Sequence, residues 1–224
     1  MFNHFIKTRF NAPFKAKDEK RLDLEWLNYR LDIFKNYCVP SVLSQTNQKF
    51  FWFILIDEQT PNSFKEKLNS IDKRISLYSD DKICFDMIKN LCDLNKKTFI
   101  SRIDSDDVYR KDFISKIQSI ETDVDEYMID TNYLCFRKSD NKYYEKNNRF
   151  SHFLSFCAKD LKKYAHVSTH MQYLSLGNNF WYKRINEPLA LEIIHGDNLY
   201  NKFDESKIKK MDIDLNNYFS QSNK

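Results

Sequence analysis

Residues 50–57 read Phe-Phe-Trp-Phe-Ile-Leu-Ile-Asp, an uninterrupted apolar run that ends on a carboxylate. The run is far too short to span a bilayer. Because both faces of an extended chain here are apolar, it predicts a strand of a parallel sheet buried between two layers of helices.

Strands and helices alternate on either side of this run. Helical spacing of Leu27, Leu31 and Phe34 predicts a helix from Leu22 to Leu43, with a bend at Pro40. The other elements expected in this half are the strands His4–Phe10, Arg74–Tyr78 and Thr98–Ile103 and the helices Asn62–Ile71, Phe85–Leu94 and Asp112–Ile120. Such alternation predicts a mostly parallel, Rossmann-like sheet flanked by helices.

The second half of the chain has longer, aromatic segments that alternate apolar and polar residues. We expect strands at Tyr127–Arg137, Tyr143–Ala158 and Leu189–His195, with a helix-like stretch at Ser168–Leu176. The predicted fold class is therefore α/β, one domain over residues 1–202 whose C-terminal half has a mixed sheet. A polar, weakly helical tail follows over residues 203–224.

Composition excludes several classes of protein. The 224 residues include two glycines, Gly177 and Gly196, so no glycine-rich phosphate loop can be written. A net charge of +4 is too small to predict nucleic-acid binding. Five scattered cysteines without a C-x-x-C pair indicate reduced thiols, and Lys7 and Arg9 interrupt any signal-peptide pattern, so we expect a cytoplasmic protein.

The most informative motif is Asp104-Ser105-Asp106-Asp107, directly after a predicted apolar strand. The carboxyl ends of strands are where open α/β sheets bind ligands. Three carboxylates this close repel one another unless cations compensate them. Asp104 and Asp106 point the same way in an extended segment, which suits a shared Mg²⁺ or Mn²⁺ ion that bridges phosphate oxygens. The alternative is a solvated turn that caps the next helix.

The Asp104-Ser105-Asp106 segment resembles the DxD signature of GT-A-type glycosyltransferases. An ordered set of further segments is similar to a bacterial family labelled rhamnosyltransferases, and it extends over most of residues 4 to 200. Its members are Thr8–Asn11, Trp26-Leu27 with Arg30, Cys38–Ser41 with Gln45, Trp52–Asp57, Ser101–Asp107 and His195–Asn198. The resemblance implies one GT-A-like domain with a nucleotide-donor half over residues 1–107 and an acceptor half over residues 108–202.

The resemblance also implies site residues. By this resemblance, the residues expected to bind the nucleotide donor are Thr8, Arg9, Asn11, Asp57, Arg102, Asp104 and Ser105. The expected cofactor is Mn²⁺ or Mg²⁺, and the expected metal ligands are Asp104, Asp106 and His195. Asp57 has an alternative role as a helix cap, Arg102 as a counter-charge and His195 as a surface turn residue. Gly196 beside His195 permits a sharp turn, and we expect it to border the active site.

An inverting transferase needs a general base, whereas a retaining one does not, and the sequence leaves this open. Candidates for the base are His166, His170, Glu192 and Asp197, of which we assign His170 and Asp197 to the catalytic set. His166 and His170 share one helical face if that segment is helical.

The predicted function is metal-dependent transfer of a sugar, rhamnose by the family label, from a nucleotide-diphosphate donor to a glycan or lipid-linked saccharide. We expect no nucleic-acid partner and at most peripheral membrane contact through Lys207, Lys209 and Lys210. One alternative is a haloacid-dehalogenase-type phosphatase, in which Asp104 is the nucleophile and Asp106 the general acid. Another is a binding protein of the same fold that has lost its activity.

Overall fold

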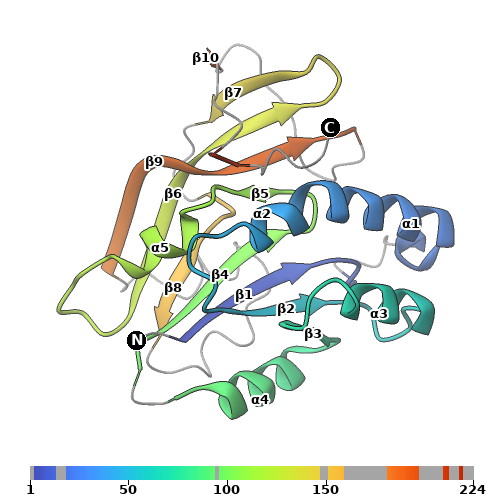
Figure 1. Ribbon diagram of the computed structural model, residues 1–224, viewed down its shortest axis with the longest axis horizontal. Coiled ribbons are helices and arrows are strands. Elements are labelled where there is room, and N and C mark those ends of the chain that lie inside the picture. The colour runs from blue at the N-terminus through green and yellow to red at the C-terminus, as the bar shows by residue number, and fades with distance from the viewer. Residues whose placement is uncertain are drawn as a thin grey trace.

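The computed structural model describes residues 3–13, 19–93, 96–146, 151–158, 181–196, 209–211 and 217–218 (Figure 1). Its N-terminal part is a parallel sheet of β1 (Asn3–Arg9), β2 (Phe51–Leu55), β3 (Ile75–Tyr78) and β4 (Thr98–Asp104). These strands lie in the order β3-β2-β1-β4. The chain therefore moves outward from β1 to β3 and then returns to the other side of β1, which creates a topological switch point between β1 and β4.

Helices cover both faces of this sheet. The helices α1 (Leu24–Ile33), α2 (Val39–Leu43), α3 (Asn62–Asn69) and α5 (Phe113–Gln118) contribute to one core cluster, and α4 (Asp81–Leu91) contributes to another (Figure 1). Because right-handed crossovers change faces when the strand order reverses, α4, which connects β3 to β4, lies opposite α1 and α3. The predicted α/β class, with a parallel N-terminal sheet between helices, is confirmed.

The two core clusters follow from the alternation of side chains along each strand. On β1, Ile6 belongs to the α1 side and Phe5 to the α4 side. On β2, Trp52 and Ile54 belong to the α1 side and Phe53 to the α4 side. All five side chains are fully buried, so the uninterrupted apolar run of β2 serves two helical layers at once.

Mixed strands form the C-terminal part of the sheet. The long β6 (Tyr127–Arg137) pairs in parallel with β9 (Trp181–Ile194) and antiparallel with β7 (Lys142–Lys146) and β8 (Ser155–Ala158). β8 also pairs antiparallel with β4, which joins the two parts of the sheet. The short strands β5 (Val108–Tyr109) and β10 (Lys209–Met211) pair with β9 and β7. The mixed C-terminal sheet is confirmed.

The predicted helix Leu22–Leu43 is one helical segment with a change of register. A short 3₁₀ turn, η1 (Glu19–Leu22), precedes α1, and a π-helical turn, η2 (Phe34–Cys38), joins α1 to α2. Within η2 the N–H of Val39 donates to the carbonyl of Phe34, five residues back. Pro40 has no N–H and its ring would clash with a carbonyl four residues back, so a wider turn accommodates it.

Three predicted elements need correction. The expected strand Tyr143–Ala158 is two strands, β7 and β8, because each pairs with a different segment of β6. The last strand begins at Trp181, not Leu189, and Lys209–Met211 of the expected helical tail is a strand. The helix expected at Ser168–Leu176 lies outside the described residues, and the donor and acceptor halves stay a prediction.

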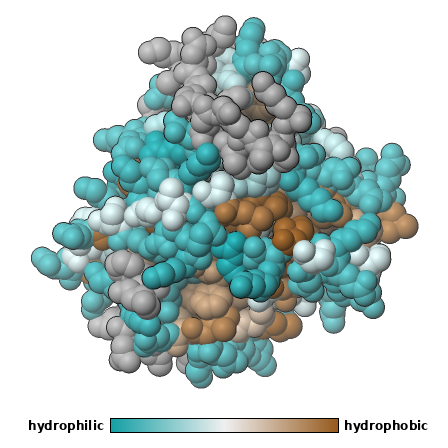
Figure 2. All heavy atoms as spheres, viewed as in Figure 1, coloured by the Kyte–Doolittle hydropathy of each residue, from teal (hydrophilic) through white to brown (hydrophobic). Residues whose placement is uncertain are grey.

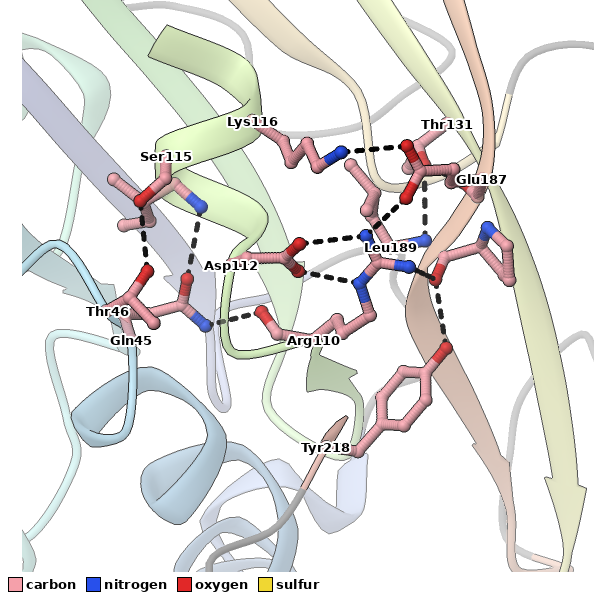
Figure 3. A network of polar contacts seen from close by, with 12 residues as sticks. Gln45, Thr46, Arg110, Asp112, Ser115, Lys116, Thr131, Glu187, Leu189 and Tyr218 are labelled. Carbon is pink, nitrogen blue, oxygen red and sulfur yellow. Dashed lines mark hydrogen bonds and ion pairs between the residues drawn. The ribbon is translucent and has the colours of Figure 1, made fainter. Parts of the chain in front are cut away.

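Polar contacts tie the corner between β5 and α5 to β9 (Figure 3). The Arg110 guanidinium donates to both carboxylate oxygens of Asp112, at 2.6 and 2.9 Å, and to Glu187 Oε2 at 2.7 Å. Gln45 reaches the same corner through Nε2, which donates to the Arg110 carbonyl at 2.8 Å. The Tyr218 hydroxyl donates to the carbonyl of Pro188 at 2.9 Å.

Hydrophilic residues cover most of the face seen in Figure 2, and hydrophobic residues reach it in separate patches. The exposed large hydrophobic residues in the described ranges are Leu24, Ile83, Leu91, Val124 and Trp181. They lie on different parts of the fold, on α1, α4, the segment before β6, and β9. No helix in the described part of the chain is long and apolar enough to cross a membrane.

Candidate active site

The acidic motif lies at the switch point of the sheet. Asp104 ends β4, and its Cα partner on the parallel neighbour β1 is Arg9. Ser105, Asp106 and Asp107 form the turn that leads into β5, and all three are buried. The three carboxylates are therefore at the carboxyl edge where such sheets bind ligands, as the sequence analysis predicted for the strand end.

Asp106 is held between α1 and the end of β9. Its Oδ2 lies 3.1 Å from Arg30 NH1 and 3.0 Å from His195 Nε2. Arg30 NH2 also donates to Ser105 Oγ at 2.5 Å. Burial alone favours the neutral acid, but Arg30 and His195 outweigh it and bring the pKa of Asp106 well below its ordinary value. The carboxylate is therefore ionised and compensated by neighbouring cationic and donor groups.

His195 is 89 residues from Asp106 in the chain, and β9 brings it to the motif. Its side chain is fully buried, and its Nδ1 lies 3.1 Å from the Tyr29 hydroxyl of α1. Both ring nitrogens therefore have protein partners. Gly196, at a positive φ of 94°, follows His195 directly, and its place at the border of the active site stays a prediction.

Asp107 has a different environment from Asp106. Its Oδ2 lies 3.1 Å from His152 Nε2, and its Oδ1 accepts from the N–H of Ile193 at 3.1 Å. Burial raises the pKa of Asp107 to about 7, because desolvation and repulsion by Asp106 exceed the effect of His152. Burial is the largest single effect on the pKa of His152 and lowers it, but the hydrogen bond and charge of Asp107, together with the charges of Glu192 and Asp104, outweigh burial, so the net shift is upward.

Asp104 is the most exposed carboxylate of the motif, with 31% of its side chain accessible. Its Oδ1 accepts from Arg102 NH2 at 2.6 Å, and Arg102 NH1 donates to the carbonyl of His152 at 2.9 Å. Arg102 is thus a counter-charge to Asp104 in this structure, and it connects β4 to the segment before β8.

Two of the three predicted metal ligands, Asp106 and His195, are in contact, whereas the carboxylate of Asp104 pairs with Arg102. Within the described ranges, no group of three or more His, Cys, Asp or Glu side chains is placed to hold a metal ion. His195 uses both ring nitrogens, and Oδ2 of Asp106 is shared between His195 and the guanidinium of Arg30. The donor set therefore does not fit a divalent ion in this arrangement.

A second polar cluster lies at the carboxyl ends of β1 and β2. The Asn11 amide donates to Thr60 Oγ1 at 2.9 Å, and its carbonyl accepts from the Asp57 N–H at 3.2 Å. Asp57 Oδ2 accepts from Arg21 Nε at 2.7 Å, and Oδ1 accepts from the N–H of Gln59 at 2.8 Å. Burial opposes ionisation of Asp57, but these donors outweigh it and lower its pKa.

Thr8, like Ser105 among the predicted donor-binding residues, is almost completely buried. It is 1% exposed, and its Oγ1 accepts from the Trp52 indole at 2.8 Å. Arg9 NH2 donates to the carbonyl of Ala12 at 2.8 Å, which holds the loop after β1. The donor-binding roles stay predictions, and the burial of Thr8 and Ser105 does not suit direct contact with a ligand.

Residues 7–134, more than half of the 224, match the protein family described as Putative rhamnosyl transferase. The chain belongs to this family. The part that matches the rhamnosyl transferase family contains Arg9, Arg30, Asp57 and the acidic motif, and it ends before His152 and His195. The predicted resemblance to rhamnosyltransferases is confirmed.

Solved structures of TarS from S. aureus resemble this member of the rhamnosyl transferase family at low similarity. One aligns with a TM-score of 0.47 and 11% identity over 87% of this chain and 37% of TarS. A structure of TarS 1–349 aligns with a TM-score of 0.49 and 11% identity over 86% and 60%. The chain spans less than two thirds of either, and neither similarity is high enough to inform its function. No curated protein matches its sequence.

Sequence reasoning missed several members of the site. Arg30 and Tyr29 carry no signal beyond their place in the Trp26-to-Arg30 segment, and Arg21 and His152 carry none. Only the expectation that three carboxylates need counter-charges pointed toward further basic residues. The predicted catalytic residues His170 and Asp197, and the candidate base His166, lie outside the described residues. Glu192 is buried and accepts from Cys135 Sγ at 2.8 Å.

Proposed function

We propose that this chain is a glycosyltransferase that moves a sugar from a nucleotide-diphosphate donor to a hydroxyl group of a glycan or lipid-linked saccharide. Rhamnose is the sugar named by the family description. The observation that carries the proposal is the set of three carboxylates with compensating arginines at the switch point between β1 and β4. That edge is where open α/β sheets bind nucleotides.

The two polar clusters suggest how the donor lies across the edge of the sheet. Asp104 and Arg102 flank the switch point, so we place the diphosphate there, where a guanidinium can bind phosphate oxygens in two places at once. Asp57 and Asn11 end the neighbouring strands, so we place the nucleoside there. The sugar then lies over the acidic motif, toward the C-terminal part of the sheet.

The prediction that Mn²⁺ or Mg²⁺ assists transfer rests on the acidic motif alone. Because the described donor set does not complete a metal site, we derive no step through a metal ion. Donor binding measured with Mn²⁺ and with EDTA tests the prediction. Binding lost in EDTA would support metal dependence, whereas equal binding would mean that protein cations compensate the diphosphate.

The phosphatase alternative has less support than glycosyl transfer. It needs Asp106 as a protonated general acid, yet Arg30 and His195 keep this carboxyl ionised. It also requires a different family from the one to which the chain belongs. An inactive binding protein would bind a nucleotide sugar without releasing a nucleoside diphosphate.

The first experiment is a melting-temperature screen against UDP-, dTDP- and GDP-linked sugars, followed by a measurement of nucleoside diphosphate release. A ligand that binds only the native state stabilises it by RT ln(1 + L/Kd), where L is the ligand concentration, so the melting temperature rises with ligand concentration. We expect one nucleotide class to stabilise the protein and to be turned over. Absence of a shift with every nucleotide, with and without Mn²⁺, would refute the proposed function.

A further inference from the structure

His152 and Asp107 form a buried imidazole–carboxylate pair beside the acidic motif. The two side chains meet at 3.1 Å, between His152 Nε2 and Asp107 Oδ2. The other oxygen of Asp107 is fixed by the backbone N–H of Ile193 on β9. The carboxylate is therefore held from two elements and sets the orientation of the ring.

The second nitrogen of His152 is available. Within the described part of the chain, Nδ1 of His152 has no hydrogen-bond partner, and it is not a buried polar atom that lacks one. The exposed fraction of the His152 side chain is 17%. When Nε2 carries the proton that it donates to Asp107, Nδ1 presents its lone pair outward. The rings of Tyr133 and Phe153, with centroids 5.2 and 4.1 Å away, pack against the imidazole.

Arg102 connects His152 to the proposed donor site. One guanidinium donates to the His152 carbonyl at 2.9 Å and to the Asp104 carboxylate at 2.6 Å. His152 also lies at the start of the segment that enters β8, on the C-terminal side of the motif where the sugar and acceptor are placed. An imidazole oriented by a buried carboxylate, with its other nitrogen free of a partner in the described part of the chain, is the arrangement of a general base.

We propose that His152 is the general base of the transfer reaction and that Asp107 is its positioning residue; this rests on the proposed function. The acceptor oxygen forms a bond to the anomeric carbon, and the bond from that carbon to the diphosphate oxygen breaks. The bonding pair leaves with the nucleoside diphosphate, and the acceptor proton passes to Nδ1 of His152. A base of this kind serves an inverting enzyme, so the product linkage has the opposite anomeric configuration to the donor.

His195 offers a contrast within the same site. It also faces a carboxylate, but both of its nitrogens are bonded and its side chain is fully buried. A proton acceptor needs an accessible lone pair, which His195 lacks in this arrangement. Of the two imidazoles at the motif, the structure therefore favours His152 for proton transfer.

The test compares His152→Gln, His152→Ala, Asp107→Asn and His170→Ala with the unmodified chain. Gln keeps an amide donor for Asp107 and fills most of the space, so it tests the base with least risk to folding. The readout is nucleoside diphosphate release from the nucleotide sugar that the screen identifies, with water as the acceptor. Donor affinity is measured separately from the melting-temperature titration.

We expect His152→Gln to lower kcat by about 10²- to 10⁴-fold while donor affinity stays within about threefold. Added imidazole should restore part of the activity of His152→Ala and leave the unmodified chain unchanged. Asp107→Asn should lower kcat with little change in KM for the donor, because it acts through the ring.

Activity of His152→Gln within threefold of the unmodified chain, or a loss of donor affinity equal to the loss of kcat, would overturn the proposal. So would a large loss in His170→Ala together with an active His152→Gln. An unmodified chain that neither binds nor turns over any nucleotide sugar would overturn the proposed function and this inference with it.

Discussion

Asp106 and Asp107 are adjacent in the chain, yet their surroundings shift their pKa values in opposite directions. Asp106 has Arg30 at 3.1 Å, whereas Asp107 has an imidazole and a backbone N–H in a buried position. A pair of carboxyl groups whose pKa values are driven apart is typical of sites that separate charge stabilisation from proton transfer. We therefore assign Asp106 to charge balance and Asp107 to the orientation of His152.

Asp106→Asn is expected to destabilise the fold. It leaves the buried guanidinium of Arg30 without its carboxylate, which costs about 3 kcal/mol in the free energy of unfolding. Asp104→Asn is the matched control, because 31% of that side chain is exposed and its ion pair with Arg102 is worth about 1 kcal/mol or less. Urea unfolding of both variants checks the difference. Equal losses would contradict the assignment of Asp106 to charge balance.

The Asp107–His152 pair predicts the sign of a pH effect on stability. The unfolded carboxyl titrates near pH 4, and the folded one at about 7, so between these values the folded state holds a proton that the unfolded state lacks. Stability from this group is thus present at low pH and lost as the pH rises toward 7. The raised pKa of His152 acts in the same direction.

We therefore expect the stability of the unmodified chain relative to Asp107→Asn to fall between pH 5 and pH 8, by about 1 to 3 kcal/mol. Melting curves of both proteins at matched ionic strength across this range provide the measurement. A difference that stays constant or grows with pH would show that the pair does not titrate in this way.

At the scale of elements, two turns need a backbone conformation that most residues avoid. In the described ranges, positive φ occurs at Asn141 (54°), in the turn from β6 to β7, and at Gly196 (94°), after β9. With so few glycines, the chain uses asparagine at one of these positions, because asparagine tolerates the left-handed region better than other residues.

Alanine at these positions has a predictable cost. Asn141→Ala and Gly196→Ala should each lower the free energy of unfolding by about 1 kcal/mol, since a Cβ at Gly196 meets no atom within 4 Å and only the backbone is strained. Asn141→Gly is the control and should be within about 0.5 kcal/mol of the unmodified chain. Chemical denaturation checks all three, and an unaffected Gly196→Ala would argue against strain at this turn.

At the scale of the whole molecule, Gln45, just after α2, joins that helix to the corner between β5 and α5. Gln45 is 2% exposed, and its Nε2 donates to the carbonyl of Arg110 (Figure 3). The same Nε2 donates to the carbonyl of Ser41, and Oε1 accepts from the N–H of Ile114. Gln45→Leu removes these bonds and leaves buried backbone groups unsatisfied, so we expect a loss of about 2–4 kcal/mol.

Glu187→Gln is the matched control for this corner of the molecule. Glu187 binds Arg110 and Lys116, but its side chain is 49% exposed, so its ion pairs contribute about 1 kcal/mol or less. Urea unfolding measures the loss in the free energy of unfolding for Gln45→Leu and for Glu187→Gln. Comparison of the two losses checks whether buried amide contacts or surface charges stabilise this corner. A larger loss for Glu187→Gln would reverse the assignment.

The sequence by itself determined the layers of the fold. Local patterns of apolar residues, with periods of two in strands and 3.6 in helices, predict which segments are buried. Such patterns occur in the run Phe51–Leu55, around Leu27 and Leu31, and in the strand before Asp104. The sequence also predicted that the carboxylates after that strand lie at a ligand-binding edge, because open α/β sheets bind ligands at the carboxyl ends of their strands. Pairings between strands distant in the chain, such as β8 with β4 and β9 with β6, had no such local signal.

Only the tertiary structure decided which groups surround the carboxylates. Arg30, His152 and His195 lie on three separate elements and come to the motif because β1, β4, β8 and β9 belong to one sheet. The charge of each carboxylate depends on burial and on partners up to 89 residues away, which neither spacing nor composition records. The acidic motif is therefore readable in the sequence, whereas the division of its three carboxylates among different tasks follows from their neighbours in space.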